Sequence, residues 1–169
     1  LKGAYVIGVQ KIGDARGFFG RSWCTREFTA QGIPMSMTQS NIAFSFKKGT
    51  LRGLHYQEKP FGEAKLIRCT RGAAYDVIVD LRPDSPTCRQ WFATELTQDD
   101  YQMVYAPEGF AHGYMTLKDN TEMTYSVSQF YTPEAERGIR YDDPALMVRW
   151  PAEVQVVSDK DRAWPDYAG

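Results

Sequence analysis

Short runs of apolar and alternating residues dominate the chain, at residues 4–9, 66–69, 73–81, 91–96, 103–106, 122–130 and 146–150. Turn-forming residues separate these runs, for example Pro83 to Pro86, Pro107 to Gly109 and Lys118 to Asn120. Many short strands divided by such turns are typical of a β-sandwich or barrel. The pattern therefore predicts an all-β fold.

Helical signals are confined to two places. Residues 22–31 are compatible with a short helix, and the tail after Pro151 contains further helix-compatible pieces. Neither alternates with strands in the manner of a βαβ unit. The 169 residues contain no internal repeat or linker, so we expect one domain over residues 1–169.

The two-residue period of a strand predicts which polar side chains point inward. Tyr125 shares one face of the run 122–130 with Met123 and Val127, while polar residues occupy the other face. Lys65 begins a second inward row by the same rule. Because burying an ammonium group is costly, an anion or a dipole must meet it there.

Charge and hydropathy exclude several classes of partner. Twenty basic and 21 acidic residues give a net charge of -1, without the basic excess that favours nucleic acid or an anionic membrane. No apolar stretch approaches the roughly 18 residues that span a bilayer, and the N-terminus lacks the layout of a signal peptide. We therefore expect a soluble protein with no nucleic-acid or membrane partner.

Three cysteines, an odd number without CxxC spacing, argue against a disulfide framework and against a cysteine zinc site: Cys24, Cys69 and Cys88. Reduced thiols in the cytoplasm are the simplest account, so the expected location is cytoplasmic. Nothing in the sequence places a base beside a cysteine, and the standard glycine-rich phosphate loops are absent.

Two histidines are the only side chains that titrate near neutral pH without a shifted pKa. His55 lies in the segment LRGLHYQ, and His112 lies in GFAHG. Both segments combine strand-forming residues with glycines, which is how a site is often built into a β scaffold. Two lone histidines supply too few of the usual ligands for a catalytic metal, so none is expected.

Five segments, in order, resemble the dTDP-4-dehydrorhamnose 3,5-epimerase family. They are Asp14 to Phe19 (DARGFF), Leu51 to Gln57, Asp76 to Arg82 with Ser85-Pro86-Thr87, Pro107 to Gly113 (PEGFAHG), and Asp142-Asp143-Pro144 before Trp150-Pro151. The resemblance covers about residues 10–161. It implies a cupin-like jelly roll with short helices near both ends, and a homodimer with an exchanged N-terminal strand, such as residues 4–9.

The resemblance also implies a reaction without metal or cofactor on a nucleoside-diphosphate 4-keto-6-deoxy sugar. The C4 ketone acidifies the hydrogens at C3 and C5, so a base can remove one and leave an enolate. Protonation from the opposite face then inverts that carbon. Such an enzyme needs a base, an acid across the ring, and a cation or donor at the enolate oxygen.

Carried over by position, His55 becomes the base, Asp161 the carboxylate that holds its tautomer, and Tyr125 the acid. Lys65 and His112 then face the sugar. The remaining matches are substrate-binding positions: Arg16 and Arg52 for the diphosphate, Phe19 and Tyr131 around the nucleobase, Gln39 and Asn41 as polar readers, and Glu136 as an acidic neighbour. By pattern alone, Tyr125 is an ordinary core aromatic and Asp161 a solvated tail residue.

Two positions need an explanation beyond the pattern. Strict alternation puts Arg52 and His55 on opposite faces of a strand, although Gly53 permits a bulge that turns both inward. Arg21 stands where the family usually has Glu, which replaces an acceptor near the nucleobase with a donor. Cytosine N3 accepts where thymine N3 donates, so we hypothesise an altered base preference unless Arg21 simply points to solvent.

Two other functions fit the same residues. One is a single-centre epimerase or isomerase of a CDP- or GDP-linked keto sugar. The other is a sugar-nucleotide binding module that has lost catalysis. The presence of His55, Tyr125 and Asp161 together argues against the binding module.

Overall fold

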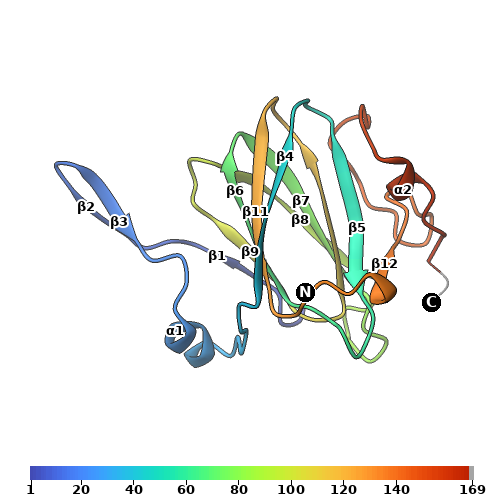
Figure 1. Ribbon diagram of the computed structural model, residues 1–169, viewed down its shortest axis with the longest axis horizontal. Coiled ribbons are helices and arrows are strands. Elements are labelled where there is room, and N and C mark those ends of the chain that lie inside the picture. The colour runs from blue at the N-terminus through green and yellow to red at the C-terminus, as the bar shows by residue number, and fades with distance from the viewer. Residues whose placement is uncertain (168–169) are drawn as a thin grey trace.

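Two five-stranded antiparallel sheets face each other in the computed structural model, which describes residues 1–167 (Figure 1). The first sheet has the order β1 (Tyr5–Ile7), β9 (Met103–Ala106), β6 (Lys65–Arg71), β11 (Thr121–Val127), β4 (Gln39–Ser45). The second has the order β12 (Glu136–Gly138), β5 (Leu51–Gln57), β10 (Phe110–Thr116), β7 (Ala73–Asp80), β8 (Trp91–Thr97).

Short helices flank this sandwich near both ends of the chain, namely α1 (Thr25–Ala30), the 3₁₀ turn η1 (Pro133–Ala135) and α2 (Asp159–Arg162). Helix α1 lies inside the predicted range 22–31, and α2 lies in the tail. The all-β, cupin-like prediction is thus confirmed. Among the described residues, no helix is long and apolar enough to cross a membrane.

The main core fills the space between the two sheets. The inward rows predicted from alternation are present, since Ile67 and Met123 are fully buried and Lys65 is only 6% exposed. The partners across the sandwich come mainly from β7, β8 and β10. The buried members of this cluster are Ile67, Cys69, Ala74, Ile78, Leu96, Val104, Ala106, Phe110, Tyr114 and Met123.

The C-terminal segment covers the outer face of the second sheet. Ile139 and Leu146 pack there against Leu54, Val77 and Val79, and α2 lies beside β5 (Figure 1). This covering explains why β7 reads as a nearly continuous apolar run, because both of its faces are buried. It also carries the tail residue Asp161 to the sheet that holds His55.

The run 146–150 is not a strand, so that prediction was wrong. The buried carboxylate of Asp143 accepts the backbone N–H groups of Ala145 and Leu146, and the Met147 N–H donates to the Asp143 carbonyl. Met147 has a φ of 50°. These bonds turn the chain, so its apolar side chains pack on the second sheet without joining a ladder.

Strand β1 pairs with β9 of the same chain, with Val6 opposite Val104. The predicted strand 4–9 is therefore an edge of its own sheet here. The segment that projects from the sandwich is the hairpin of β2 (Lys11–Asp14) and β3 (Gly17–Gly20) (Figure 1). Near its turn, the Phe18 ring packs edge-on against Tyr101, with 4.8 Å between the ring centroids.

The motif from Asp80 to Thr87 has a structural role. The Asp80 carboxylate is fully buried and accepts hydrogen bonds from the Arg82 guanidinium and from the hydroxyls of Ser85 and Thr87, at 2.5–2.8 Å. Because every donor comes from the turn after β7, the carboxylate fixes that turn.

Candidate active site

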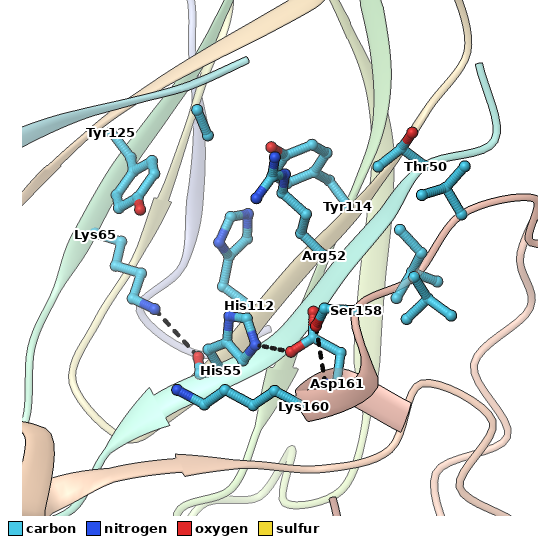
Figure 2. Close-up of a pocket in the computed structure, with 14 residues that line it drawn as sticks. Thr50, Arg52, His55, Lys65, His112, Tyr114, Tyr125, Ser158, Lys160 and Asp161 are labelled. Atoms are coloured by element: carbon cyan, nitrogen blue, oxygen red, sulfur yellow. Dashed lines mark hydrogen bonds and ion pairs between the residues drawn. The ribbon is translucent and has the colours of Figure 1, made fainter. Parts of the chain in front are cut away.

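A cavity of about 410 Å³ opens between the sheets beside α2 (Figure 2). Six of the residues chosen from the sequence line it, and they come from β5, β6, β10, β11 and α2. The predicted members are Arg52, His55, Lys65, His112, Tyr125 and Asp161. Five separated stretches of chain therefore meet in one place.

His55 and Asp161 form a close pair at this cavity. His55 Nε2 lies 2.5 Å from Asp161 Oδ1, and the Gly53 N–H donates to Asp161 Oδ2 at 3.3 Å. Ser158 caps α2 by accepting the Asp161 N–H, which fixes the backbone that carries the carboxylate. The tail acid that pattern alone leaves in solvent is only 4% exposed.

The Asp161 carboxylate is charged at neutral pH. Burial acts to raise its pKa, but the hydrogen bond with His55 and the N–H of Gly53 outweigh that effect, so the pKa lies below its usual value. An anion at Nε2 selects the imidazole tautomer that carries its proton there. His55 Nδ1 then has a free lone pair.

A bulge in β5 turns both Arg52 and His55 toward the cavity. In the pairing with β10, His55 lies opposite His112 and Arg52 lies opposite Tyr114, so three steps on β5 match two on β10. Gly53 sits inside this bulge with a φ of 125°. The irregularity that Gly53 permits is therefore present, and strict alternation fails at this point.

Gly53 and Gly113 allow the two strands to approach closely at the bulge. A Cβ on Gly53 would lie 2.5 Å from Gly113 Cα, and a Cβ on Gly113 would lie 2.8 Å from the Arg52 carbonyl oxygen. Arg52 itself reaches β4, where its guanidinium donates to Ser45 Oγ and to the Phe44 carbonyl. Its remaining N–H groups are available to an anionic ligand.

Tyr125 comes from the sheet opposite His55, and Figure 2 shows its ring on the other side of the cavity. Burial raises the pKa of its phenol, with a further increase from Glu63, while Arg52 acts in the opposite direction. The phenol therefore stays protonated at neutral pH and has a proton to give. Asn41 is its neighbour on β4.

Lys65 and His112 complete the cavity wall with paired polar groups. Lys65 Nζ donates to the His55 carbonyl at 3.1 Å and lies 3.2 Å from Glu63 Oε1, which meets the requirement for an anion and a dipole. His112 Nε2 lies 2.7 Å from Asp76 Oδ1, and both side chains are buried. Each cation or imidazole is thus held in place before a ligand arrives.

Several residues of the site were missed from the sequence. Asp76 could have been found, because alternation places it on the same face of its run as Ile78. The others have no distinctive sequence signal, since they include small and apolar residues of the tail. They are Tyr114, Ser158, Lys160 and the apolar or small residues Ala43, Thr50, Leu51, Val156 and Val157.

A second group of predicted residues lies beside the cavity. The Tyr131 hydroxyl donates to Glu136 Oε2 at 2.7 Å, and Lys160, which lines the cavity, lies 2.6 Å from the same oxygen. The Gln39 side-chain oxygen accepts the Tyr131 N–H. Tyr131, Glu136 and Gln39 are therefore connected to the site through Lys160.

The structure does not bring the hairpin residues to this cavity. Arg16 pairs with Asp14 at 2.6 Å on the projecting hairpin, and the nearby Phe19 side chain is 63% exposed. Arg21 follows the hairpin and pairs with Glu27 at 2.8 Å, with both side chains largely exposed. In residues 1–167, no three His, Cys, Asp or Glu side chains converge in a way that would hold a metal ion.

Comparison with known proteins decides the family. The family model described as dTDP-4-dehydrorhamnose 3,5-epimerase matches residues 1–168. The chain belongs to this family. A dTDP-4-dehydrorhamnose 3,5-epimerase of Sinorhizobium fredii is 42% identical over 161 residues, which are 95% of this chain and 83% of the relative.

The family also shares the fold in detail. The crystal structure of a dTDP-6-deoxy-D-glucose-3,5-epimerase from Legionella pneumophila, in complex with dTDP-4-keto-L-rhamnose, superposes with a TM-score of 0.88 at 35% identity. The match covers 98% of this chain and 94% of that one.

A dTDP-4-dehydrorhamnose 3-epimerase of Streptomyces niveus is 35% identical, covering 96% of this chain and 78% of the relative.

Proposed function

We propose that this protein is a single-domain, carbohydrate-acting isomerase that inverts C3 and C5 of a dTDP-linked 4-keto-6-deoxy sugar. The observation that carries the proposal is His55 of β5, paired with the Asp161 carboxylate of α2, facing the protonated Tyr125 on the other sheet. A base and an acid on opposite walls of a cavity are what inversion beside a ketone requires.

His55 Nδ1 takes the proton from the carbon next to the ketone, and the electron pair of that bond moves into the enolate. Asp161 keeps the tautomer with the proton on Nε2 and stabilises the imidazolium that forms. Lys65 offers positive charge and N–H donors toward the enolate oxygen, and His112 faces the sugar beside it. Tyr125 then delivers a proton to the opposite face of the carbon, and solvent restores both groups.

The test is conversion of dTDP-4-keto-6-deoxy-D-glucose, followed by proton NMR of the product sugar. The account predicts signals of the L-configured 4-keto sugar. Since the ketone itself makes the hydrogens acidic, no metal or cofactor enters the proposal, and prior treatment with EDTA leaves the rate unchanged. A rate that falls with EDTA and returns with a divalent ion would contradict the metal-free mechanism.

Inversion at one centre is the second candidate, favoured by the likeness to the Streptomyces niveus 3-epimerase. Deuterium from heavy water separates the two reactions. Label at C3 and C5 marks the double epimerase, and label at one carbon marks the single-centre enzyme. Absence of label with dTDP-, CDP- and GDP-linked 4-keto sugars alike would favour the binding module.

We infer that the working form is a homodimer. The hairpin of β2 and β3 projects from the sandwich (Figure 1), and its residues Arg16 and Phe19 do not line the cavity of their own chain; exchange of this N-terminal segment would bring both to the cavity of a second copy. Mixing inactive His55→Ala with weakened Phe19→Ala subunits tests this inference. Exchange of subunits should restore part of the activity, and a monomer by analytical ultracentrifugation would overturn it.

The altered base preference remains a hypothesis for Arg21. Its ion pair with Glu27 occupies the guanidinium, and its exposure fits the simpler account in which Arg21 faces solvent. Turnover of dTDP- and CDP-linked 4-keto sugars, compared in the wild type and in Arg21→Glu, decides between them. A dTDP preference that Arg21→Glu leaves unchanged would overturn the hypothesis.

A cytoplasmic location is also part of the proposal. It is supported by the three thiols, which are free in the structure: Cys24, Cys69 and Cys88. Fractionation of the source cells with an antibody against the protein tests it directly.

A further inference from the structure

Trp164 lies against the catalytic pair, although neither the pattern nor the cavity lining singled it out. Its ring meets the His55 imidazole edge-on, with 6.4 Å between the ring centroids. It comes three residues after Asp161, directly beyond the end of α2. One side chain therefore stands beside both members of the pair.

Gly138 provides the notch in which the indole sits. A Cβ at Gly138 would lie 2.2–2.5 Å from three atoms of the Trp164 ring, so only glycine leaves room for it. Gly138 is the register partner of His55 in the β12–β5 ladder. Its φ is not in the left-handed region. The absence of a side chain is therefore what this position requires, because the backbone would accept alanine.

The indole N–H of Trp164 is buried. Its Nε1 atom has no acceptor with hydrogen-bond geometry among the described residues. Even so, the N–H favours the charged form of Asp161, after the larger effects of burial, His55 and Gly53 on the pKa of that carboxyl. The Lys160 ammonium lies over the ring, 5.6 Å from its centroid. The indole is thus held between the tail and β12.

We propose that Trp164 is a positioning residue, whose indole in the Gly138 notch keeps the His55 ring and the Asp161 carboxylate aligned for proton abstraction. The proposal rests on the proposed function for its kinetic consequence. The Ser158 cap fixes the backbone of α2, but this helix has only four residues, so the side chains packed beside it also determine where the Asp161 carboxylate lies. Small displacements of a catalytic group lower the rate by large factors, so the Trp164 indole, which determines the position of that group, should affect kcat.

Four variants test the proposal. Trp164→Ala should lower kcat about tenfold while KM stays within about twofold. Trp164→Phe keeps a ring but removes the N–H, so it should move the acidic limb of the pH profile of kcat upward, as the Asp161 carboxyl loses a nearby group that favours its charged form. Gly138→Ala should reproduce the kcat loss, because its methyl group displaces the indole. The double variant Trp164→Ala with Gly138→Ala should have the same kcat as Trp164→Ala alone, because both changes remove the same contact.

Trp150→Phe is the matched control. Trp150 is another tryptophan of the C-terminal segment; its indole N–H donates to the Tyr141 carbonyl, and its ring packs against Tyr75 rather than His55. Its variant should lower Tm and leave kcat and the pH profile unchanged. If Trp164→Ala and Gly138→Ala lower Tm but leave kcat and the pH profile unchanged, as expected for the control, Trp164 has only a structural role and the proposal fails. The proposal also fails if the effects of the two changes on kcat add in the double variant.

Proton NMR of the free enzyme separates this failure from a failure of the proposed function. The chain has two histidines, so His55→Ala assigns the ring signals of His55 and His112. Trp164→Ala should shift the His55 signals and leave those of His112 in place. If the wild type does not turn over the dTDP sugar, the shift still supports the contact. Unchanged His55 signals would overturn it.

Discussion

His55 and Asp161 are 106 residues apart in the chain, and their side chains meet at 2.5 Å. The contact exists because the tail covers the outer face of the second sheet and places α2 beside β5 (Figure 1). A base on a rigid strand is thereby oriented by an acid on a separate segment. The catalytic pair depends on the packing of the tail.

Replacement of Asp161 by Asn should reduce kcat by about 100-fold or more, because the amide cannot fix the productive tautomer or stabilise the imidazolium. The measurement is kcat at saturating dTDP-linked 4-keto sugar, with Tm recorded for the same samples. Asp159→Asn is the matched control, since Asp159 lies on the same helix but does not line the cavity. Similar losses in both variants would contradict the assigned role.

Tyr125→Phe should separate exchange from inversion. The variant retains His55, so the substrate still exchanges hydrogen for deuterium, but no phenol protonates the opposite face. We expect inverted product to fall by about 100-fold while exchange with retained configuration persists. NMR in heavy water measures both. Equal loss of exchange and inversion would assign Tyr125 to binding or to the first step.

The pH dependence of Tyr125 follows from the direction of its pKa. Because burial raises that pKa above its usual value of 10.0, the phenol keeps its proton across the neutral and mildly alkaline range. Activity should therefore not decline through Tyr125 below about pH 10. A pH profile of kcat for the wild type checks this. A basic limb near pH 8 that disappears in Tyr125→Phe would contradict it.

Gly53→Ala should unfold the bulge on which the site is built. The added methyl group would clash with the backbone of β10, and an alanine at this position would have to adopt a positive φ. We therefore expect the free energy of unfolding to fall by about 3 kcal/mol and most of the activity to be lost. Gly32→Ala is the control, since Gly32 has a φ of 77° but open space around it. That variant should cost about 1 kcal/mol and retain wild-type kcat. Urea denaturation and kinetics measure both.

Asp80→Asn should destabilise the protein by about 3 kcal/mol at pH 7, because it leaves Arg82 without its buried partner. Burial alone would raise the pKa of Asp80, but hydrogen bonds from Arg82, Ser85 and Thr87 hold it well below its usual value of 3.8. The stabilisation by Asp80 is therefore complete at a pH above the usual pKa of 3.8, and it is lost as the pH falls toward and through the lower pKa of the folded protein.

Urea denaturation at pH 7 and near pH 3 tests the Asp80 prediction. The difference between wild type and Asp80→Asn should shrink at the lower pH. Asp14→Asn, which breaks the exposed pair with Arg16, should leave the midpoint unchanged at both values. A difference that does not depend on pH would show that the charge of Asp80 is not the stabilising element.

Much of the fold was predictable because alternation reports burial directly. Tyr125 and Lys65 lie inward as their strands require. The run 146–150 failed because a side-chain cap at Asp143 competes with strand pairing, and hydropathy does not register such a cap. Strand β4 was missed, since its exposed Ile42 and its polar residues give no clean period.

The residues of the site were predictable where their residue type is rare in the chain. They were less predictable where long-range packing determines which side chains reach the site. Two histidines and the family motifs located His55 and His112. Nothing local indicates that Lys160 reaches the cavity or that Trp164 packs beside His55, because the path of the tail determines their place. The hairpin residues Arg16 and Phe19 lie away from the cavity of their own chain, and their roles remain predictions.

The most direct test of the central claim is proton NMR of the protein with dTDP-4-keto-6-deoxy-D-glucose in heavy water, beside His55→Ala. The account predicts deuterium at C3 and C5 with the wild type and none with the variant. Exchange that persists in His55→Ala at the wild-type rate would contradict the assignment of His55 as the base, and with it the mechanism built on the His55–Asp161 pair.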